Sequence, residues 1–294
     1  MPLHPLTSIH TAELFAPLHR ELMALLRGLS PDDWLRPTVA GDWRVRDVAA
    51  HLLEVDMRNL SVTRDGHVLP ADRHIAGYRD LVGWINHLNA TGVATSRRFS
   101  ARVTMDLLDV TGVWVAEMVA SLPPDGPAVF GVAWAGESSS TQWMDTGREY
   151  TERWHHQAQV RDALGVPRLL ARRWLEPLMQ LSVRSLPVAC STLDVPVGSS
   201  VLLDVEPVAP DTATLSWTVT REPNGWRAWT GSPDVPSVAT AVPGVRTARV
   251  RLAADDAWRV FYNALDEEAA RTRATVEGDT TMAARVLTAR SVMV

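Results

Sequence analysis

The hydrophobic periodicity of the chain changes near residue 165, and this change constrains the fold more than any other feature. Before it, apolar residues recur three or four positions apart over long stretches such as 11–29 and 105–122, the spacing of a one-sided helix. After it, short segments such as Thr247–Leu252 alternate, as half-buried strands do. We therefore predict an α+β chain with a helical domain over residues 1–166 and a smaller domain over 167–294.

The first part contains long segments with helical periodicity, joined by polar or Pro-rich stretches. These segments are 11–29, 42–60, 78–99, 105–122 and 141–164. Four long helices with one long crossover connection indicate a four-helix bundle, and such bundles often hold metal ions between facing helices. Residues 64–73 form a polar segment that contains Gly, His and Pro and predict a loop. Residues 128–135 alternate weakly and are expected to be extended or to form an irregular crossover.

The second part combines short alternating segments with two amphipathic ones. Asn224-Gly225 separates two such strands and is a strong hairpin signal. The expected strands are 200–205, 214–219, 226–229, 247–252 and 274–277, and the expected helices are 172–186, 255–265 and 279–289. This pattern predicts an α/β sandwich with an antiparallel sheet.

Composition excludes several classes of protein. The net charge is −5, the isoelectric point is near 6.0, and no basic patch predicts nucleic-acid binding. No apolar run approaches the roughly 18 residues of a membrane span, and the N-terminus lacks the pattern of a signal peptide. We therefore expect a cytoplasmic protein without membrane or nucleic-acid partners.

Cysteine and lysine usage narrows the possible chemistry. Cys190 is the only cysteine and follows an apolar segment, so a buried, unreactive side chain is the expected role. A zinc site made of several thiolates from one chain is excluded. All 29 basic residues are arginine, which excludes Schiff-base chemistry and a phosphate-loop lysine.

Three residues on two predicted helices have the chemistry of a metal site. Glu152 and His156 are four residues apart and share one helical face. His51 on another helix supplies a third ligand, and three protein ligands leave an open position, as in catalytic zinc sites. Imidazole and carboxylate also suit manganese, iron or nickel. The alternatives are a helix-stabilising Glu–His pair and a hydrogen-bonded core histidine.

His155 is an alternate to His156 as the second ligand of this helix. His156 falls on the same face as Glu152 and Gln159, whereas His155 is rotated by about 100°. We therefore expect His156 to point inward.

Several motifs of the chain resemble one known family, that of the mycothiol-dependent maleylpyruvate isomerases. Its N-terminal domain, one of the DinB-like metal-binding bundles, resembles this chain at Leu29–Trp34, Trp43–Leu52, Glu152–His156 and Ala163–Gly165. Its second domain, related to sterol-carrier folds, resembles Trp258–Phe261 and Val276–Asp279.

The resemblance implies zinc on His51, Glu152 and His156, and mycothiol or another low-molecular-weight thiol as cofactor. Many relatives carry an acid three residues after the second histidine, where this chain has Gln159. An amide cannot act as a general base and is a weak metal ligand, so Gln159 leaves the reaction open.

The leading hypothesis is a zinc-dependent, thiol-using transferase or isomerase that acts on a small electrophilic substrate. Its candidate catalytic residues are Gln159, together with Arg221 and Arg227 as bidentate partners of substrate carboxylates. One alternative is a thiol-independent, metal-dependent hydrolase, lyase or biosynthetic enzyme. Another is a non-catalytic protein that binds a hydrophobic ligand in its C-terminal domain. The oligomeric state stays open.

Overall fold

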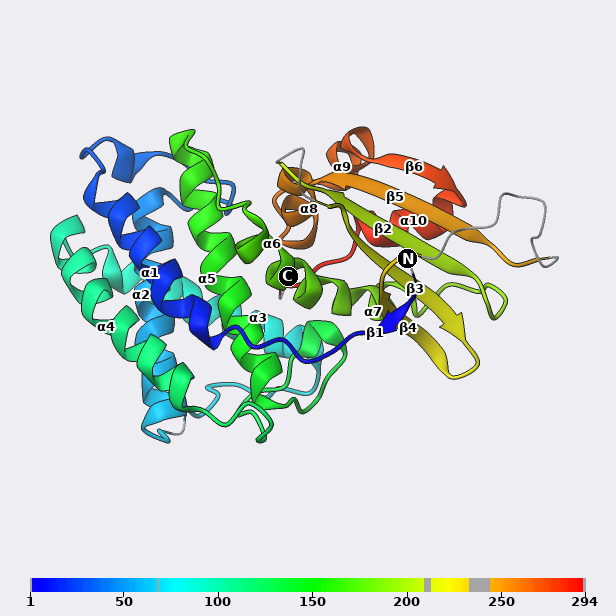
Figure 1. The fold of residues 1–294 in the computed structure, drawn as a ribbon. Helices are drawn as coiled ribbons and strands as arrows, with labels where there is room; N and C mark the ends of the chain where they lie inside the picture. Colours follow the sequence, from blue (N-terminus) through cyan, green and yellow to red (C-terminus); the bar gives the residue numbers. More distant parts are fainter. Residues whose placement is uncertain (1, 68, 209–212, 233–243, 293–294) are drawn as a thin grey trace. The chain divides into compact units, whose positions relative to one another are not determined.

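The computed structural model describes residues 2–67, 69–208, 213–232 and 244–292 (Figure 1). These residues form two compact units. The helical unit consists of His10–Gly131 and Ser139–Arg168, and the sheet unit consists of the chain up to Ile9, Val132–Ser138 and the chain from Leu169 onward. The chain therefore enters the sheet unit three times, twice through short segments that precede or interrupt the helical unit.

Five long helices make up most of the helical unit. They are α1 (Ala12–Arg27), α2 (Val45–Asn59), α3 (Tyr78–Ser96), α4 (Ala101–Ser121) and α5 (Gln142–Leu164). Helices α1, α2, α4 and α5 pack side by side, while α3 lies in the connection from α2 to α4 and contacts α2 (Figure 1). The predicted four-helix bundle with one long crossover is confirmed.

The apolar stripes that predicted these helices form the core of the bundle. Leu22 and Leu26 of α1, Leu52 of α2, Leu108 of α4 and Val160 of α5 are all buried and belong to one cluster. Burying each of these side chains stabilises the fold by about 1.5–3 kcal/mol before entropy is counted. This cluster therefore joins all four helices of the bundle.

A capping interaction sets the start of α2 and thereby the place of His51. The backbone N–H of Arg44 donates to Asp47 Oδ2 at 3.0 Å, and Arg97 Nε donates to Asp47 Oδ1 at 2.8 Å. Asp47 satisfies a backbone donor at the helix N-terminus. His51 follows four residues later on the same side of the helix.

One six-stranded sheet forms the centre of the sheet unit, in the order β1-β4-β3-β2-β5-β6. Its strands are β1 (His4–Pro5), β2 (Ser200–Glu206), β3 (Leu215–Glu222), β4 (Gly225–Thr230), β5 (Thr247–Ala253) and β6 (Thr275–Gly278). Strands β3 and β4 form the predicted hairpin at Asn224-Gly225, with Glu222 paired to Gly225.

The sheet differs from the predicted antiparallel one at a single pair. Strands β2 and β5 are parallel, whereas every other neighbouring pair among the described strands is antiparallel. Strand β3 of the β3–β4 hairpin pairs with one edge of β2, and β5 pairs with the other edge and runs parallel to β2. The predicted α+β class is confirmed.

Helices of the sheet unit cover the apolar side of this sheet. They are α6 (Arg172–Ser182), α7 (Leu186–Cys190), α8 (Ala254–Phe261), α9 (Glu267–Arg273) and α10 (Thr280–Leu287). Helix α7 contacts β4, and α8 and α10 contact β2 and β5. Cys190 is fully buried and burial raises its pKa to about 12, so the thiol is unreactive at neutral pH.

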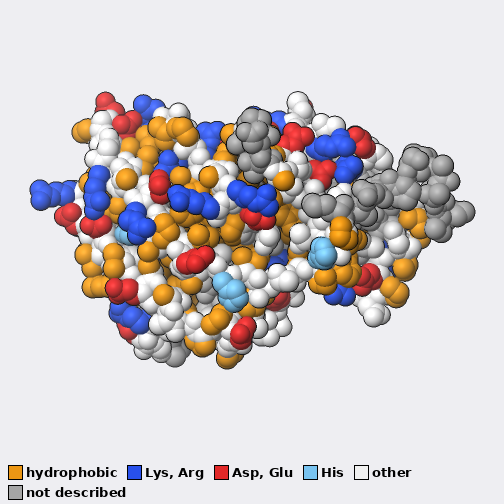
Figure 2. Space-filling view, viewed as in Figure 1, with side chains coloured by type: hydrophobic (Ala, Val, Ile, Leu, Met, Phe, Trp, Pro, Cys, Tyr) orange, Lys and Arg blue, Asp and Glu red, His pale blue; other side chains and the backbone are white. Residues whose placement is uncertain are grey.

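Short helical turns occur between the main elements. They are the 3-10 turns η1 (Asp33–Leu35), η3 (Ala133–Ala135) and η4 (Val183–Ser185) and the π-helical turn η2 (Leu60–Arg64). None of the helices in the described ranges is long and apolar enough to cross a membrane. Figure 2 shows acidic and basic side chains interspersed over the visible face.

Candidate metal centre

Three side chains from α2 and α5 converge inside the helical bundle. His51 Nε2 lies 3.2 Å from Glu152 Oε1, and His156 Nε2 lies 3.1 Å from the same oxygen. One potential ligand atom from each residue lies within 4.8 Å of the others. The structure thus brings together the three residues that the sequence predicts as metal ligands.

Packing of the two helices explains this convergence. His51 is 1% exposed and lies among Val48, Leu52 and Val55, which are also buried. Helix α2 contacts α5, whose residues Glu152 and His156 lie one turn apart on the facing side. Because apolar neighbours hold α2 in place, the imidazole of His51 projects toward α5.

The Nδ1 atoms of the three histidines have different hydrogen-bond partners. His156 Nδ1 lies 2.8 Å from Gln159 Oε1, so Nδ1–H donates to the amide oxygen. His155 Nδ1 lies 2.9 Å from the carbonyl oxygen of Thr151. His51 Nδ1 is buried and has no hydrogen-bond partner among the described residues. Gln159 therefore holds the His156 tautomer in which Nε2 carries a lone pair.

Aromatic rings enclose the two candidate histidine ligands. The ring centroid of Trp43 lies 5.0 Å from that of His51 and 6.4 Å from that of His156. The two imidazoles meet edge to face with centroids 4.6 Å apart. These contacts restrict ring rotation and keep water away from one side of the cluster.

Burial and neighbouring charges set the ionisation of the cluster. Burial, together with the charge of His156, lowers the pKa of His51 to about 4 and that of His155 to about 3. Burial alone would raise the pKa of Glu152, but the contacts with His156, His155 and His51 bring it well below its usual value. Near neutral pH the cluster therefore holds a carboxylate beside neutral imidazoles of His51 and His155.

The donor set fits a divalent metal ion. With Nδ1–H of His156 directed at Gln159, the Nε2 lone pair faces Glu152 Oε1, so two acceptors lie 3.1 Å apart. This contact is unfavourable unless a proton or a cation lies between the atoms. Two imidazole nitrogens and a carboxylate suit zinc and several other divalent ions, and His51 provides the third direction.

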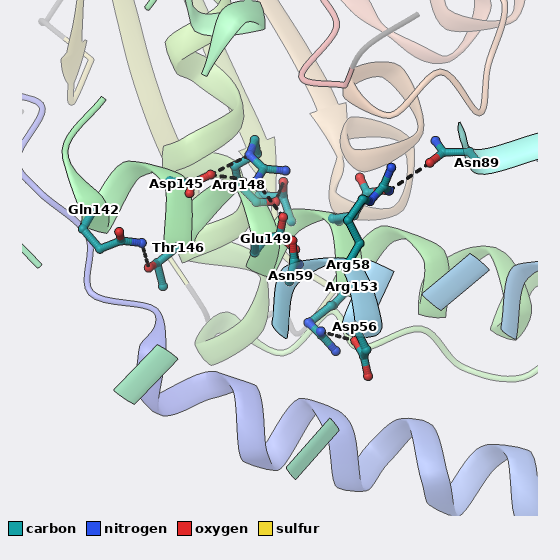
Figure 3. Close-up of polar contacts among 12 residues, drawn as sticks. Asp56, Arg58, Asn59, Asn89, Gln142, Asp145, Thr146, Arg148, Glu149 and Arg153 are labelled. Atoms are coloured by element: carbon teal, nitrogen blue, oxygen red, sulfur yellow. Dashed lines mark hydrogen bonds and ion pairs between the residues drawn. The ribbon is translucent and has the colours of Figure 1, made fainter. Parts of the chain in front are cut away.

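A polar network around Arg148 lies on α5, next to the turn that carries Glu152 (Figure 3). The guanidinium of Arg148 contacts Asp145 Oδ1 at 2.7 Å and Glu149 Oε1 at 2.6 Å. Asn59 Nδ2 of α2 donates to Glu149 Oε2 at 2.6 Å. Burial, opposed by Arg148 and reinforced by Glu149, raises the pKa of Asp145. Three carboxylates thus lie along α5 with one guanidinium among them, an arrangement that favours a further cation.

Sequence reasoning missed this network, although a signal for it exists. Asp145, Glu149, Glu152 and His156 are spaced by four, three and four residues, which places them on one helical face. Charged residues at core spacing in a bundle helix indicate an inward-facing polar cluster. The partner on α2, Asn59, has no comparable signal.

The other predicted site residues lie in different places. Gln159 belongs to the cluster through His156. Arg221 and Arg227 are in β3 and β4 of the sheet unit, where Arg227 pairs with Thr220 and Arg221 with Trp226. Successive strand residues point to opposite faces, so Arg221 and Arg227 lie on opposite faces of the sheet. The two arginines therefore do not form one carboxylate clamp, and their role as substrate ligands stays a prediction.

Arg227 has an aromatic neighbour on its own strand. Its guanidinium lies 4.4 Å from the ring centroid of Trp229, within the range of a cation–π contact. Arg221 instead donates from Nη1 to the carbonyl oxygen of Glu222 at 2.9 Å.

Comparison with known proteins links the chain to one family. Residues 15–161, half of the chain, match the Mycothiol maleylpyruvate isomerase N-terminal domain family. No curated protein matches the chain. A crystal structure of a histidine-to-alanine mutant of the mycothiol-dependent maleylpyruvate isomerase is similar over 90% of this chain and 91% of that one, with 10% identity and a TM-score of 0.52.

A second crystal structure of a mycothiol-dependent maleylpyruvate isomerase covers 85% of this chain and 86% of its own, with 11% identity and a TM-score of 0.48. The first structural similarity extends over both units and shows the fold. The family match includes His51, Glu152 and His156. The chain belongs to the mycothiol maleylpyruvate isomerase N-terminal domain family.

Proposed function

We propose that the protein is a metal-dependent transferase or isomerase that acts on a small electrophilic substrate. It would use mycothiol, or a related low-molecular-weight thiol, as its cofactor. The observation that carries the proposal is the convergence of His51, Glu152 and His156 within 4.8 Å, in a family named for a mycothiol-dependent isomerase. We take zinc as the metal because a site with two imidazoles, one carboxylate and an open position is typical of catalytic zinc.

The residues of the cluster have separable roles in this proposal. His51, Glu152 and His156 hold the metal, and Gln159 orients His156 by accepting a hydrogen bond from its Nδ1–H. When bound, the metal supplies a positive charge that lowers the pKa of a coordinated thiol and polarises a substrate oxygen. Gln159 is then a positioning residue, because its oxygen is already occupied by His156 and an amide is not a general base.

Buried surroundings make the site suitable for a thiolate nucleophile. His51 and His156 are 1% and 7% exposed, and Glu152 is partly exposed. Exclusion of water strengthens the attraction between a metal and a thiolate. Arg221 or Arg227 remains a candidate for binding a substrate carboxylate.

Spectroscopy of a cobalt-substituted protein tests the thiol directly, without knowledge of the substrate. We expect mycothiol to produce a sulfur-to-cobalt charge-transfer absorption in the wild-type protein. The analogue in which serine replaces the cysteine of mycothiol is the matched control and produces none. The His156→Ala variant with mycothiol also produces none.

Each other outcome favours one of the alternatives. Bound cobalt without a charge-transfer band on addition of mycothiol or other thiols would favour the thiol-independent metalloenzyme. A protein that binds no metal but co-purifies with a lipid, detected by native mass spectrometry, would favour the hydrophobic-ligand-binding protein. If the band appears, turnover of maleylpyruvate and of other small electrophiles with and without mycothiol identifies the substrate class.

A further inference from the structure

The face of α4 that points away from the bundle carries a stripe of exposed apolar side chains. Val103, Leu107, Val110 and Trp114, here called the α4 stripe, are 44, 39, 46 and 45% exposed, whereas Leu108 is buried on the inner side. In Figure 2 hydrophobic side chains are visible among charged ones at the left edge, where Figure 1 places α4. Single exposed apolar residues are ordinary, but a continuous stripe is a mark of an interaction surface.

Spacing within the α4 stripe is that of a coiled-coil seam. Successive members are four, three and four residues apart, the a/d repeat of two helices that pack along their length. The bundle already uses the opposite side of α4, which contacts α1 and α2. The stripe is therefore a second packing surface on the same helix.

The α4 stripe is symmetric about its own midpoint, which lies between residues 108 and 109. Val103 and Trp114 are equally far from this point, and so are Leu107 and Val110. An antiparallel copy of α4 consequently places Val103 against Trp114 and Leu107 against Val110 at every contact. A large side chain then faces a smaller one at both ends, as interdigitating packing requires.

Charges beside the stripe favour this antiparallel arrangement. Arg102 near the start of α4 and Glu117 near its end are exposed on the same flank of the stripe. Arg102 is 3.8 Å from Asp106, and Glu117 forms no ion pair with the described residues. A parallel copy would bring like charges together, whereas an antiparallel copy places Arg102 beside Glu117 of the partner subunit.

We propose that the α4 stripe is the interface with a second copy of this chain, related by a two-fold axis through the midpoint of the stripe. Such a contact is closed, since each copy uses the same surface. Trp114 is its aromatic anchor. One helix pair buries less than the about 1,200 Å² of a standard interface, so the dimer dissociates on dilution.

Sedimentation velocity of the untagged full-length chain tests the interface. Over about 1 to 100 μM, we expect the wild-type protein to shift from monomer to dimer. Val110→Arg should raise the dissociation constant at least about tenfold. Val129→Arg is the matched control, because Val129 is 52% exposed in the same unit outside the stripe. Both positions are exposed, and thermal unfolding verifies that both variants fold.

A charge exchange and a cross-link test the antiparallel register. Glu117→Arg alone should weaken the dimer, and adding Arg102→Glu should restore it. Oxidation of an equimolar mixture of Leu107→Cys and Val110→Cys proteins should give mainly the mixed covalent dimer, because the antiparallel register places residue 107 against residue 110 of the other copy. The wild type, whose Cys190 is buried, should form no covalent dimer. The proposal is overturned if the wild type stays monomeric throughout, if Val110→Arg has no effect, or if the double exchange binds no better than Glu117→Arg.

Discussion

Helices α2 and α5 carry two buried polar clusters that differ in how their charge is balanced. In one, Glu152 meets His51 and His156. In the other, Asp56 is fully buried, contacts the guanidinium of Arg153 and accepts a hydrogen bond from Thr111 Oγ1 at 2.9 Å. Burial raises the pKa of Asp56, and Arg153 opposes the increase.

The difference supports our proposal that one cluster is structural and that the other binds a metal ion. Arg153 supplies the positive charge for Asp56 from within the chain, and its guanidinium also lies 5.6 Å from the ring centroid of Phe15. The carboxylate of Glu152 faces imidazole nitrogens instead. The first cluster has its balancing charge within the chain, and we propose that a bound cation supplies the balancing charge of the second.

Removal of Arg153 should have the largest effect on stability. Arg153→Ala leaves the Asp56 carboxylate buried without its cation, so we expect the free energy of unfolding to fall by about 3–5 kcal/mol. Chemical denaturation of the metal-free protein measures the change. Arg161→Ala, which breaks a 3.1 Å pair with the more exposed Glu21, should cost no more than about 1 kcal/mol. Equal losses in the two variants would remove the distinction between the clusters.

Removal of a proposed metal ligand should greatly weaken zinc binding but have little effect on the stability of the metal-free protein. We expect His156→Ala to reduce zinc affinity by at least about 100-fold, because loss of a first ligand costs at least as much as loss of an outer partner. The metal-free protein should lose much less stability than the Arg153→Ala variant. Competition with a chromophoric chelator measures affinity. His155→Ala is the adjacent control and should retain zinc. If His155→Ala loses zinc while His156→Ala retains it, His155 and not His156 is the metal ligand.

A smaller loss of zinc affinity is expected on substitution of Gln159, and this loss distinguishes a positioning residue from a catalytic one. Gln159→Ala removes the acceptor of the His156 Nδ1 proton, so zinc affinity should fall about 10- to 100-fold. Gln159→Glu preserves an acceptor and should restore the affinity. Unchanged zinc affinity in Gln159→Ala would contradict the positioning role.

Asp47→Asn should have the smallest effect and should depend on pH. Contacts with Arg97 and with the backbone N–H of Arg44 lower the pKa of Asp47 despite the opposing effect of burial. A lowered folded-state pKa stabilises the protein above the unfolded-state value and ceases to do so as pH falls through the folded-state value. We expect a loss of about 1 kcal/mol at pH 7.

The same comparison for Asp47→Asn at low pH provides the control. The difference in free energy of unfolding between wild type and variant should vanish in acid, where Asp47 is protonated. A difference that stays constant from neutral to acidic pH would mean that hydrogen bonding alone, without charge, anchors the start of α2.

Much of the fold could be predicted because local periodicity determines it. Helix α1 follows directly from a long apolar stripe, and the β3–β4 hairpin follows from Asn224-Gly225. The parallel pairing of β2 with β5 could not be predicted, because strand order depends on contacts between distant residues. The short β1 strand likewise gains its partner β4 from more than two hundred residues away.

The candidate site divides in the same way. The pair Glu152 and His156 is a local pattern, and His51 could be added through the bundle and the family resemblance. The hydrogen bond from His156 to Gln159 and the ion pair between Arg153 and Asp56 depend on side-chain rotamers and interhelical distances. Sequence periodicity carries neither quantity.

Elemental analysis of the untagged protein tests the central claim most directly. Wild-type protein equilibrated with zinc and dialysed against metal-free buffer should retain one zinc ion per chain, and the Arg161→Ala variant, which alters a pair with Glu21 outside the cluster, should retain the same amount. The His51→Ala and His156→Ala variants should retain none. A wild-type protein without stoichiometric metal, or variants with unchanged metal content, would contradict the assignment of His51, Glu152 and His156 as a metal site.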